Sequence, residues 1–273
     1  MIARGTSAAL LVALGMALAT VGVEGQEKHS AFELGTVIER GAVHAFEDAF
    51  DIRGFRLGDS EGQVDKLINE LIAEIGPIVR VRRVDQAAWV YDARAAYEYT
   101  ERLELQFSEG GVSDSISISF GTPASGASVD EITRSIVYLG NILPPLEATV
   151  RSIRTKYGTP SLTFESGQGV YFTYRWIDGA LVKPGDVGAD GDNCTGNAGY
   201  SPFRYRASMT TTGGCTATLS VSVTSDGEGR VSMLIQTLTS FERRQRDFEL
   251  STAFIDAAIE KDHAASGVAP PKL

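Results

Sequence analysis

Hydrophobic residues recur at helical spacing in residues 61–75. Their apolar positions fall on one stripe of a helix: Val64, Leu67, Ile68, Leu71, Ile72 and Ile75. Ser60 precedes the stripe as a helix N-cap, and Gln63 follows as its capping-box partner. Gly76 and Pro77 end the pattern. These residues predict an amphipathic helix that begins after Ser60.

The same spacing predicts two further helices. Residues 143–161 open with two prolines and reach a helix end at Gly158; the apolar face holds Leu146, Val150, Ile153 and Tyr157. Residues 241–262 form the last helix, with an apolar side of Phe241, Phe248, Phe254, Ile255 and Ile259. Each helix therefore has one face to bury.

Between the helices, apolar and polar residues alternate as in β-strands. The clearest case is a hairpin of residues 100–108 and 113–120, joined by a turn at 109–111, whose serines form a wet face. Residues 131–139 fit a helix or a strand, and their β-branched content favours a strand. The other predicted strands are 78–84, 168–177, about 203–210, 215–224 and 230–239.

The order of these elements repeats along the chain. Residues 50–140 and residues 141–263 each contain a helix followed by strands, and the second unit also contains the C-terminal helix. We therefore predict an α+β fold of two tandem units, each a helix packed on a roughly four-stranded antiparallel sheet. Residues 264–273 are predicted to be a disordered tail.

Residues 1–25 have the features of an export signal. Arg4 precedes a long uncharged stretch, and Ala19 ends a small-x-small cleavage site, with Gly25 as a second one. Cleavage is the favoured interpretation, and an uncleaved anchor is the alternative. The mature chain would begin with a leader segment, residues 26–49, and would be periplasmic or secreted. No second long apolar run follows, so we expect no stable membrane insertion after cleavage.

The chain has two cysteines, Cys194 and Cys215. In an exported protein, a single pair predicts one disulfide bond. Two free, buried thiols are the alternative. A redox motif is not indicated, because the sequence contains no C-x-x-C.

Two short motifs resemble envelope proteins of Gram-negative bacteria. The first is a glycine and aromatic pair, an LG-x-S turn and a helix: Gly54, Phe55, Leu57, Gly58, Asp59, Ser60, Val64 and Leu67. The second matches KYG-x-PS in Lys156, Tyr157, Gly158, Thr159, Pro160 and Ser161. The chain thus resembles the superfamily of β-lactamase-inhibitor proteins and SmpA/OmlA outer-membrane assembly lipoproteins. The resemblance implies helices on one face of an antiparallel sheet, and a binding role.

The chain departs from those groups in its cysteines. It lacks the lipobox cysteine of the assembly lipoproteins, and its single pair allows at most one disulfide, whereas the inhibitors carry one in each repeat. No binding residue of either group can be placed on its positions. The resemblance therefore concerns the fold more than the site.

Charge and motif content narrow the functional classes. With 35 acidic and 25 basic residues the net charge is -10, which argues against nucleic-acid binding. The three histidines are His29, His44 and His263, and none has metal-ligand spacing. P-loop, dinucleotide-binding and common serine-nucleophile motifs are absent from the sequence. We therefore predict no cofactor and no catalytic residue.

Weak candidates for a site lie in the second half of the chain. Asp190, Asp192 and Asn193 offer oxygen ligands for calcium, but their spacing does not fit an EF-hand, so a solvated acidic loop is favoured. Tyr171 and Tyr200 are candidates for contact with a partner.

Other noticeable side chains are expected to be structural. Alternation assigns Tyr174 and Trp176 to the core. Two arginine groups are expected to pair with local carboxylates rather than bind phosphate: Arg80, Arg82 and Arg83, and Arg243, Arg244 and Arg246.

From the sequence we predict a soluble, exported module that binds an envelope or secreted protein. Two alternatives remain: an envelope hydrolase without a recognisable motif, and a calcium or small-ligand binder that uses residues 186–193. The hydrolase would need carboxylates with perturbed pKa values that converge in a cleft.

Overall fold

The computed structural model describes residues 50–75, 80–90, 94–140, 142–186 and 215–266. The elements follow the chain in this order: α1 (Glu61–Ile75), β1 (Arg80–Val90), β2 (Arg94–Glu109), β3 (Val112–Phe120), the short 3-10 helix η2 (Pro123–Ser125), β4 (Val129–Tyr138), α2 (Leu146–Tyr157), β5 (Leu162–Ser166), β6 (Gly169–Ile177), β7 (Ala180–Leu181), β8 (Cys215–Ser225), β9 (Val231–Ser240) and α3 (Phe241–Ser266). The predicted α+β class is confirmed.

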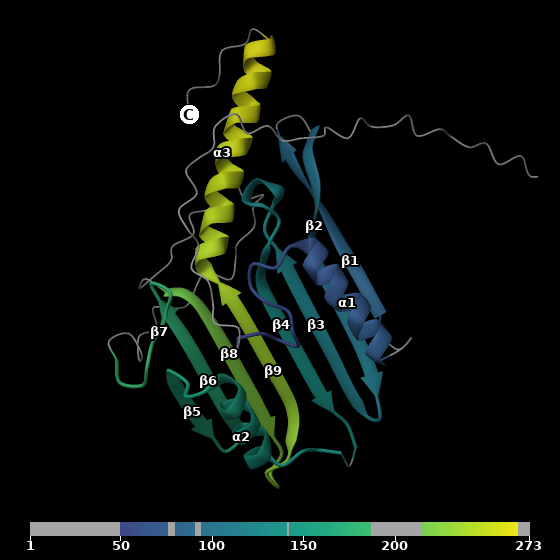
Figure 1. The fold of residues 1–273 in the computed structure, drawn as a ribbon, viewed down its shortest axis with the longest axis vertical. Helices are drawn as coiled ribbons and strands as arrows, with labels where there is room; N and C mark the ends of the chain where they lie inside the picture. Colours follow the sequence, from purple (N-terminus) through teal and green to yellow (C-terminus); the bar gives the residue numbers. More distant parts are fainter. Residues whose placement is uncertain (1–49, 76–79, 91–93, 141, 187–214, 267–273) are drawn as a thin grey trace, which may run out of the picture. The chain divides into compact units, whose positions relative to one another are not determined.

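The strands form one antiparallel sheet in the order β1-β2-β3-β4-β9-β8-β6-β5, with β7 paired to β6 (Figure 1). Helices α1 and α2 cover the same face, here called the helix face, because their buried residues join one core with alternate residues of the strands. The opposite face is called the open face. The two predicted units therefore share one sheet and one core, joined where β4 pairs with β9.

The register of the strands explains the two faces. On the helix face Leu103 lies opposite Ile118 and Leu105 opposite Ile116, and all four are 0–1% exposed. Ser117, between the two isoleucines, points to the open face and is half-buried. The wet face predicted for this hairpin is thus the open face of the sheet.

Helix α1 begins as the sequence predicts. The Ser60 N–H donates to Oε1 of Gln63 at 2.8 Å, and the Gln63 N–H donates to Oγ of Ser60 at 3.3 Å. This reciprocal pair is a capping box, which satisfies two amides that the first helical turn leaves without partners. Val64, Ile68 and Leu71 then lie buried on the predicted stripe.

Helix α2 also agrees with the prediction, although its N-terminus differs in chemistry from that of α1. Pro145 is the N-cap and makes no side-chain hydrogen bond. At the other end Gly158 has φ of +77° and its N–H donates to the carbonyl of Arg154 at 2.9 Å. Glycine adopts this conformation without strain, so Gly158 ends the helix.

The strand predictions are mostly confirmed. Residues 131–139 form a strand, because β4 pairs along its length with β3 and β9. Strands β5 and β7 were missed by the sequence pattern; they are short and lack clear alternation. The strand predicted near 203–210 lies outside the described residues.

Helix α3 extends to Ser266, beyond residue 264, where the sequence predicts a tail to begin. Phe241 is buried as predicted, but the buried side of the first turns also contains Asp247, Leu250 and Ser251. Within the described ranges, we find no helix long and apolar enough to cross a membrane. The predicted signal peptide and leader lie outside those ranges.

Candidate functional site

The second sequence motif contacts the segment that directly precedes the first. Lys156 Nζ donates to the carbonyl of Asp51 at 3.0 Å, and the hydroxyl of Tyr157 donates to the same carbonyl at 2.9 Å. The ring of Phe50 stacks on Tyr157 at 5.8 Å and meets Trp176 edge-on at 4.6 Å. Tyr174 is fully buried beside them. These residues fasten the segment before α1 to α2 and the sheet, so they serve the fold.

The end of the second motif is structural as well. Ser161 is buried, its hydroxyl donates to the carbonyl of Val182 at 2.6 Å, and it accepts the Arg175 N–H at 3.0 Å. Gly58, in the first motif, has φ of +89°, and the guanidinium of Arg243 packs where a side chain would stand. Such motifs encode turns and close contacts rather than a binding site.

Two of the three residues in the first arginine group, Arg82 and Arg83, pair with carboxylates as predicted. Arg82 lies 3.4 Å from Glu104, and Arg83 pairs with Glu61 and, at 3.2 Å, with Asp65 on α1. The Arg83 pairs join β1 to α1 across the helix face. This group therefore has a local role in the structure.

The second arginine group belongs to a polar junction between α3 and the sheet. Arg244 lies 3.7 Å from Asp130 and 3.1 Å from Glu131. Close by, Asp247 accepts the N–H of Thr122 at 2.7 Å and its hydroxyl at 2.6 Å. The sequence missed this junction, because its members are far apart in the chain and match no motif.

The junction contains an acid whose pKa is perturbed. Burial raises the pKa of Asp130 to about 7, a shift that Arg244 opposes and that Asp247 and Glu131 reinforce. Asp130 is 3% exposed and Asp247 is 1% exposed, and neither lines the hollows described below. A hydrolase needs its carboxylates to reach a substrate. This pair is therefore better explained as an anchor for α3.

The metal candidates are untested. Asp190, Asp192 and Asn193 lie outside the described residues, as do His29 and His44. Where the chain is described, no group of three or more histidine, cysteine or acidic residues could hold a metal ion. The sequence gives no other metal candidate.

The cysteine prediction is also untested, because Cys194 lies outside the described residues. Cys215 is the first residue of β8 and is 6% exposed. A cysteine buried at the start of a strand can pack as a thiol or as half of a disulfide.

The structure describes one of the two residues that the sequence predicts to contact a partner. Tyr200 lies outside the described residues. Tyr171 is 39% exposed on β6, on the open face, whereas Tyr174 and Trp176 are buried in the core, as the alternation predicts. Directly opposite Tyr171 in the register is Phe164 of β5, which is 63% exposed. The sequence missed Phe164 because residues 162–166 were not recognised as a strand.

Phe164 and Tyr171, together with the half-buried Leu162, form an apolar surface at one end of the sheet, here called the edge patch. Large apolar side chains that lie side by side and remain exposed to solvent commonly mark an interaction surface. Strand β5 is the last strand in the sheet order, and no described strand pairs with its outer edge. The edge patch therefore combines exposed aromatic rings with unpaired backbone.

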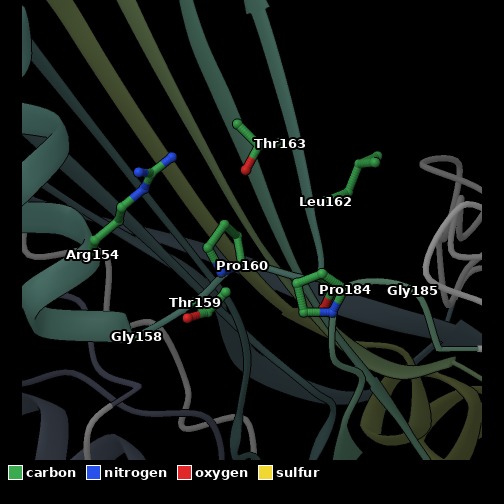
Figure 2. A pocket seen from close by; sticks show the side chains of 9 residues that line it. Arg154, Gly158, Thr159, Pro160, Leu162, Thr163, Pro184 and Gly185 are labelled. Atoms are coloured by element: carbon green, nitrogen blue, oxygen red, sulfur yellow. The ribbon is translucent and has the colours of Figure 1, made fainter.

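A hollow of about 550 Å³, here called the edge hollow, lies beside β5 (Figure 2). It is lined by Arg154, Gly158, Thr159, Pro160, Ser161, Leu162, Thr163, Pro184 and Gly185. Figure 2 shows Arg154 extending from α2 on one side, with Leu162 and Pro184 on the other. The guanidinium carbon of Arg154 is 5.4 Å from the ring centre of Phe172, a cation–π contact that holds it over the sheet.

A second hollow of about 530 Å³ lies over β1–β4. Its polar lining comes mainly from the open face: Arg80, Arg82, Glu104, Gln106, Ser115, Ser117, Thr133 and Ser135. It has no aromatic side chain and no buried charge aimed into it. The edge patch and edge hollow are therefore the better candidates for a site.

Comparison of the chain with protein-family models, curated proteins and solved structures finds no match. The candidate site therefore rests on the chain's own residues and geometry.

Proposed function

We propose that the chain is an exported, soluble module of the cell envelope that binds a protein through the edge patch. The observation that carries this proposal is the pairing of two exposed aromatic residues, Phe164 at 63% on the edge strand β5 and Tyr171 at 39% on the neighbouring strand β6. Aromatic side chains supply much of the binding energy at protein interfaces, because they bury a large area at low entropic cost.

Site-specific photo-crosslinking tests this function. A photoreactive phenylalanine analogue replaces Phe164 in the full chain, and the purified protein is irradiated alone and in an envelope extract. The matched control carries the same analogue at Val81, a 45%-exposed apolar residue of β1, the strand at the other end of the sheet. A discrete protein adduct from position 164 and none from position 81 is the expected result.

A substitution strengthens the test. Phe164→Ser removes the larger ring, and we expect it to reduce recovery of the crosslinking partner roughly tenfold when the analogue is placed at Tyr171. Val81→Ser, the matched control, is expected to leave recovery unchanged. If position 164 yields no adduct in either sample, the edge patch is not a protein-binding surface.

Signal cleavage and the disulfide bond, the two predicted features of an exported protein, are tested separately. We propose that the chain is cleaved after Ala19 or Gly25 and carries a disulfide between Cys194 and Cys215. Mass spectrometry of the protein from an envelope fraction, with and without reduction, measures both. An intact N-terminus would favour the anchor, and free thiols on both cysteines would rule out the bridge.

We also infer that the chain contains two tandem units of one helix and about four strands. The mirrored strand order supports this, because β1-β2-β3-β4 runs inward from one edge and β5-β6-β8-β9 runs inward from the other. In this arrangement β1 and β5 occupy equivalent outer positions. Strand β5 carries the exposed Phe164, whereas the described side chains of β1, residues 80–85, include no aromatic ring, so a binding role would be particular to the second unit.

A further inference from the structure

We propose that the protein bound at the edge patch is a second copy of this chain, and that the two copies pair antiparallel through β5. This inference rests on the proposed function and names its partner. The paired strands would be related by a two-fold axis at Phe164. The argument has three parts: the free backbone of β5, the charges on its helix face, and the aromatic rings on its open face.

The backbone of β5 has groups available for pairing. A two-residue loop joins β5 to β6, so its flanking residues, Ser166 and Gly169, form a hydrogen-bonded pair. In an antiparallel ladder, residues alternate between bonding one neighbour and the other. Thr163 and Glu165 therefore direct their backbone groups to the outer edge, where no described strand pairs with them.

Only one two-fold-symmetric register pairs all five residues of β5. With the axis at Phe164, residues 162–166 of each copy pair with residues 166–162 of the other, and Thr163 lies opposite Glu165 as a hydrogen-bonded pair. An axis at Glu165 would place the two Glu165 carboxylates opposite each other, which is unfavourable. An axis at Thr163 would bring Glu165 opposite Ser161, which lies outside the strand.

The charges on the helix face complement one another in this register. Glu165 is exposed, and opposite Thr163 it would enter the edge hollow of the other copy, which Arg154 and Thr163 line. Arg154 is also exposed, and within the described part of the chain it has no carboxylate partner, unlike Arg83 and Arg134. Because the dimer would have two-fold symmetry, it would contain two equivalent Glu165–Arg154 ion pairs.

The open face carries the apolar contact. The two copies of Phe164 would be a non-hydrogen-bonded pair, the kind whose side chains approach most closely, flanked by Tyr171 from each copy. Pairing would thus cover the edge patch and remove an exposed sheet edge, which proteins otherwise protect with charge or with a covering segment. A five-residue strand makes a small interface, so we expect a dissociation constant in the micromolar range.

Sedimentation of the full mature chain across a range of concentrations tests the proposal. We expect a monomer–dimer equilibrium that Phe164→Ser weakens by roughly tenfold or more. Glu165→Arg and Arg154→Glu, each placing like charges together, are expected to weaken it by roughly tenfold. The double variant restores both ion pairs with reversed sign and is expected to return to within about threefold of the original affinity.

Arg151→Glu is the matched control, because Arg151 is also exposed on α2 but does not line the edge hollow. It makes the same charge change and is expected to leave the equilibrium unaltered. Circular dichroism spectra of all variants establish that they fold. A variant that fails to fold is replaced by Glu165→Gln or Arg154→Gln, which remove the ion pair without reversing a charge.

The outcomes separate this inference from the proposed function. A monomer at concentrations up to about 0.1 mM, or a dimer that the charge reversals leave unchanged, overturns the β5 pairing. If the chain is monomeric and position 164 crosslinks a different protein, the binding function stands and only the identity of the partner is wrong. If position 164 gives no adduct and the chain is monomeric, both are wrong.

Discussion

The sheet has two parts with different cores. Under α1, strands β1–β4 present mostly aliphatic side chains, among them Leu103, Ile116 and Ile118, together with the rings of Phe107 and Phe120. Under α2, strands β5–β9 meet a group of aromatic rings that includes Phe172, Tyr174 and Trp176. The first is here called the aliphatic part and the second the aromatic part.

The two parts are specified in different ways. In the aliphatic part, the alternation within each strand is enough to predict which side chains are buried. In the aromatic part, the buried Tyr157 needs hydrogen-bond partners that come from distant segments, namely Asp51 and Gln236. Both parts combine packing with long-range polar contacts, such as the Arg83–Asp65 pair in the first and the Tyr157 hydrogen bonds in the second. The comparison teaches that the two parts differ mainly in the kind of side chain that fills the core.

The largest expected difference between the parts is in the unfolding free energy that is lost when a buried side chain is truncated to alanine. Trp176→Ala removes a side chain that is 2% exposed and meets the ring of Phe50 at 4.6 Å. We expect it to lower the free energy of unfolding by about 4 kcal/mol. Ile118→Ala in the aliphatic part is expected to cost about 3 kcal/mol. Chemical denaturation measures both, and a larger loss for Ile118 would break the comparison.

The next difference is in pH dependence. Because Asp130 of β4 has a pKa of about 7, above its ordinary 3.8, the folded protein holds a proton that the unfolded chain releases between about pH 4 and pH 7. Stability from this group therefore falls as the pH rises through that window, by an amount on the order of 4 kcal/mol. Burial raises the pKa of Tyr174 to about 12, so its hydroxyl ionises only at strongly alkaline pH.

Asp130→Asn tests this assignment. The amide does not titrate, so the difference in unfolding free energy between the variant and the original chain should shift in favour of the variant from pH 4 to pH 7. Thermal melts across that range give the measurement. A difference that stays constant with pH would show that Asp130 does not carry the titration.

A smaller loss of stability is expected when a buried hydrogen-bonding group of the aromatic part is removed. Tyr157→Phe removes the hydroxyl that donates to the Asp51 carbonyl at 2.9 Å and accepts from Gln236 Nε2 at 3.2 Å. Gln236 is 6% exposed, so its amide would be left buried without that partner. We expect a loss of about 2 kcal/mol in a denaturation experiment. A loss no greater than that of Ile68→Val, about 1 kcal/mol, would mean that the hydrogen bonds contribute little.

The smallest expected effect concerns the start of α1. Ser60→Ala removes the capping box and should cost about 1 kcal/mol, whereas Ser60→Asp keeps an N-cap acceptor and should cost less. Helix α2 has no side-chain cap to lose at Pro145. Hydrogen exchange of the first-turn amides would locate the change. Equal exchange in both variants would show that the cap does not hold the helix end.

Much of the fold is predictable from local pattern. The capping box of Ser60, the hairpin of β2 and β3, and the end of α2 at Gly158 each depend on residues that are close in the chain. Strand β5 was missed because an exposed edge strand has no buried side to produce a clear alternation, and the missed strand carries Phe164. Of the candidate site, the sequence indicated Tyr171 as a contact residue, and it indicated the lining residues Gly158, Thr159, Pro160 and Ser161 only as part of a motif.

The sequence by itself determined the class of the fold, the three helices and most of the strands, because periodicity records which side of an element is buried. Only the tertiary structure decided that β4 lies beside β9, that Asp130 and Glu131 meet Arg244 at the base of α3, and that β5 forms an outer edge of the sheet. These contacts join segments far apart in the chain, and no local pattern of residues records which distant partner will satisfy a polar group or a strand edge.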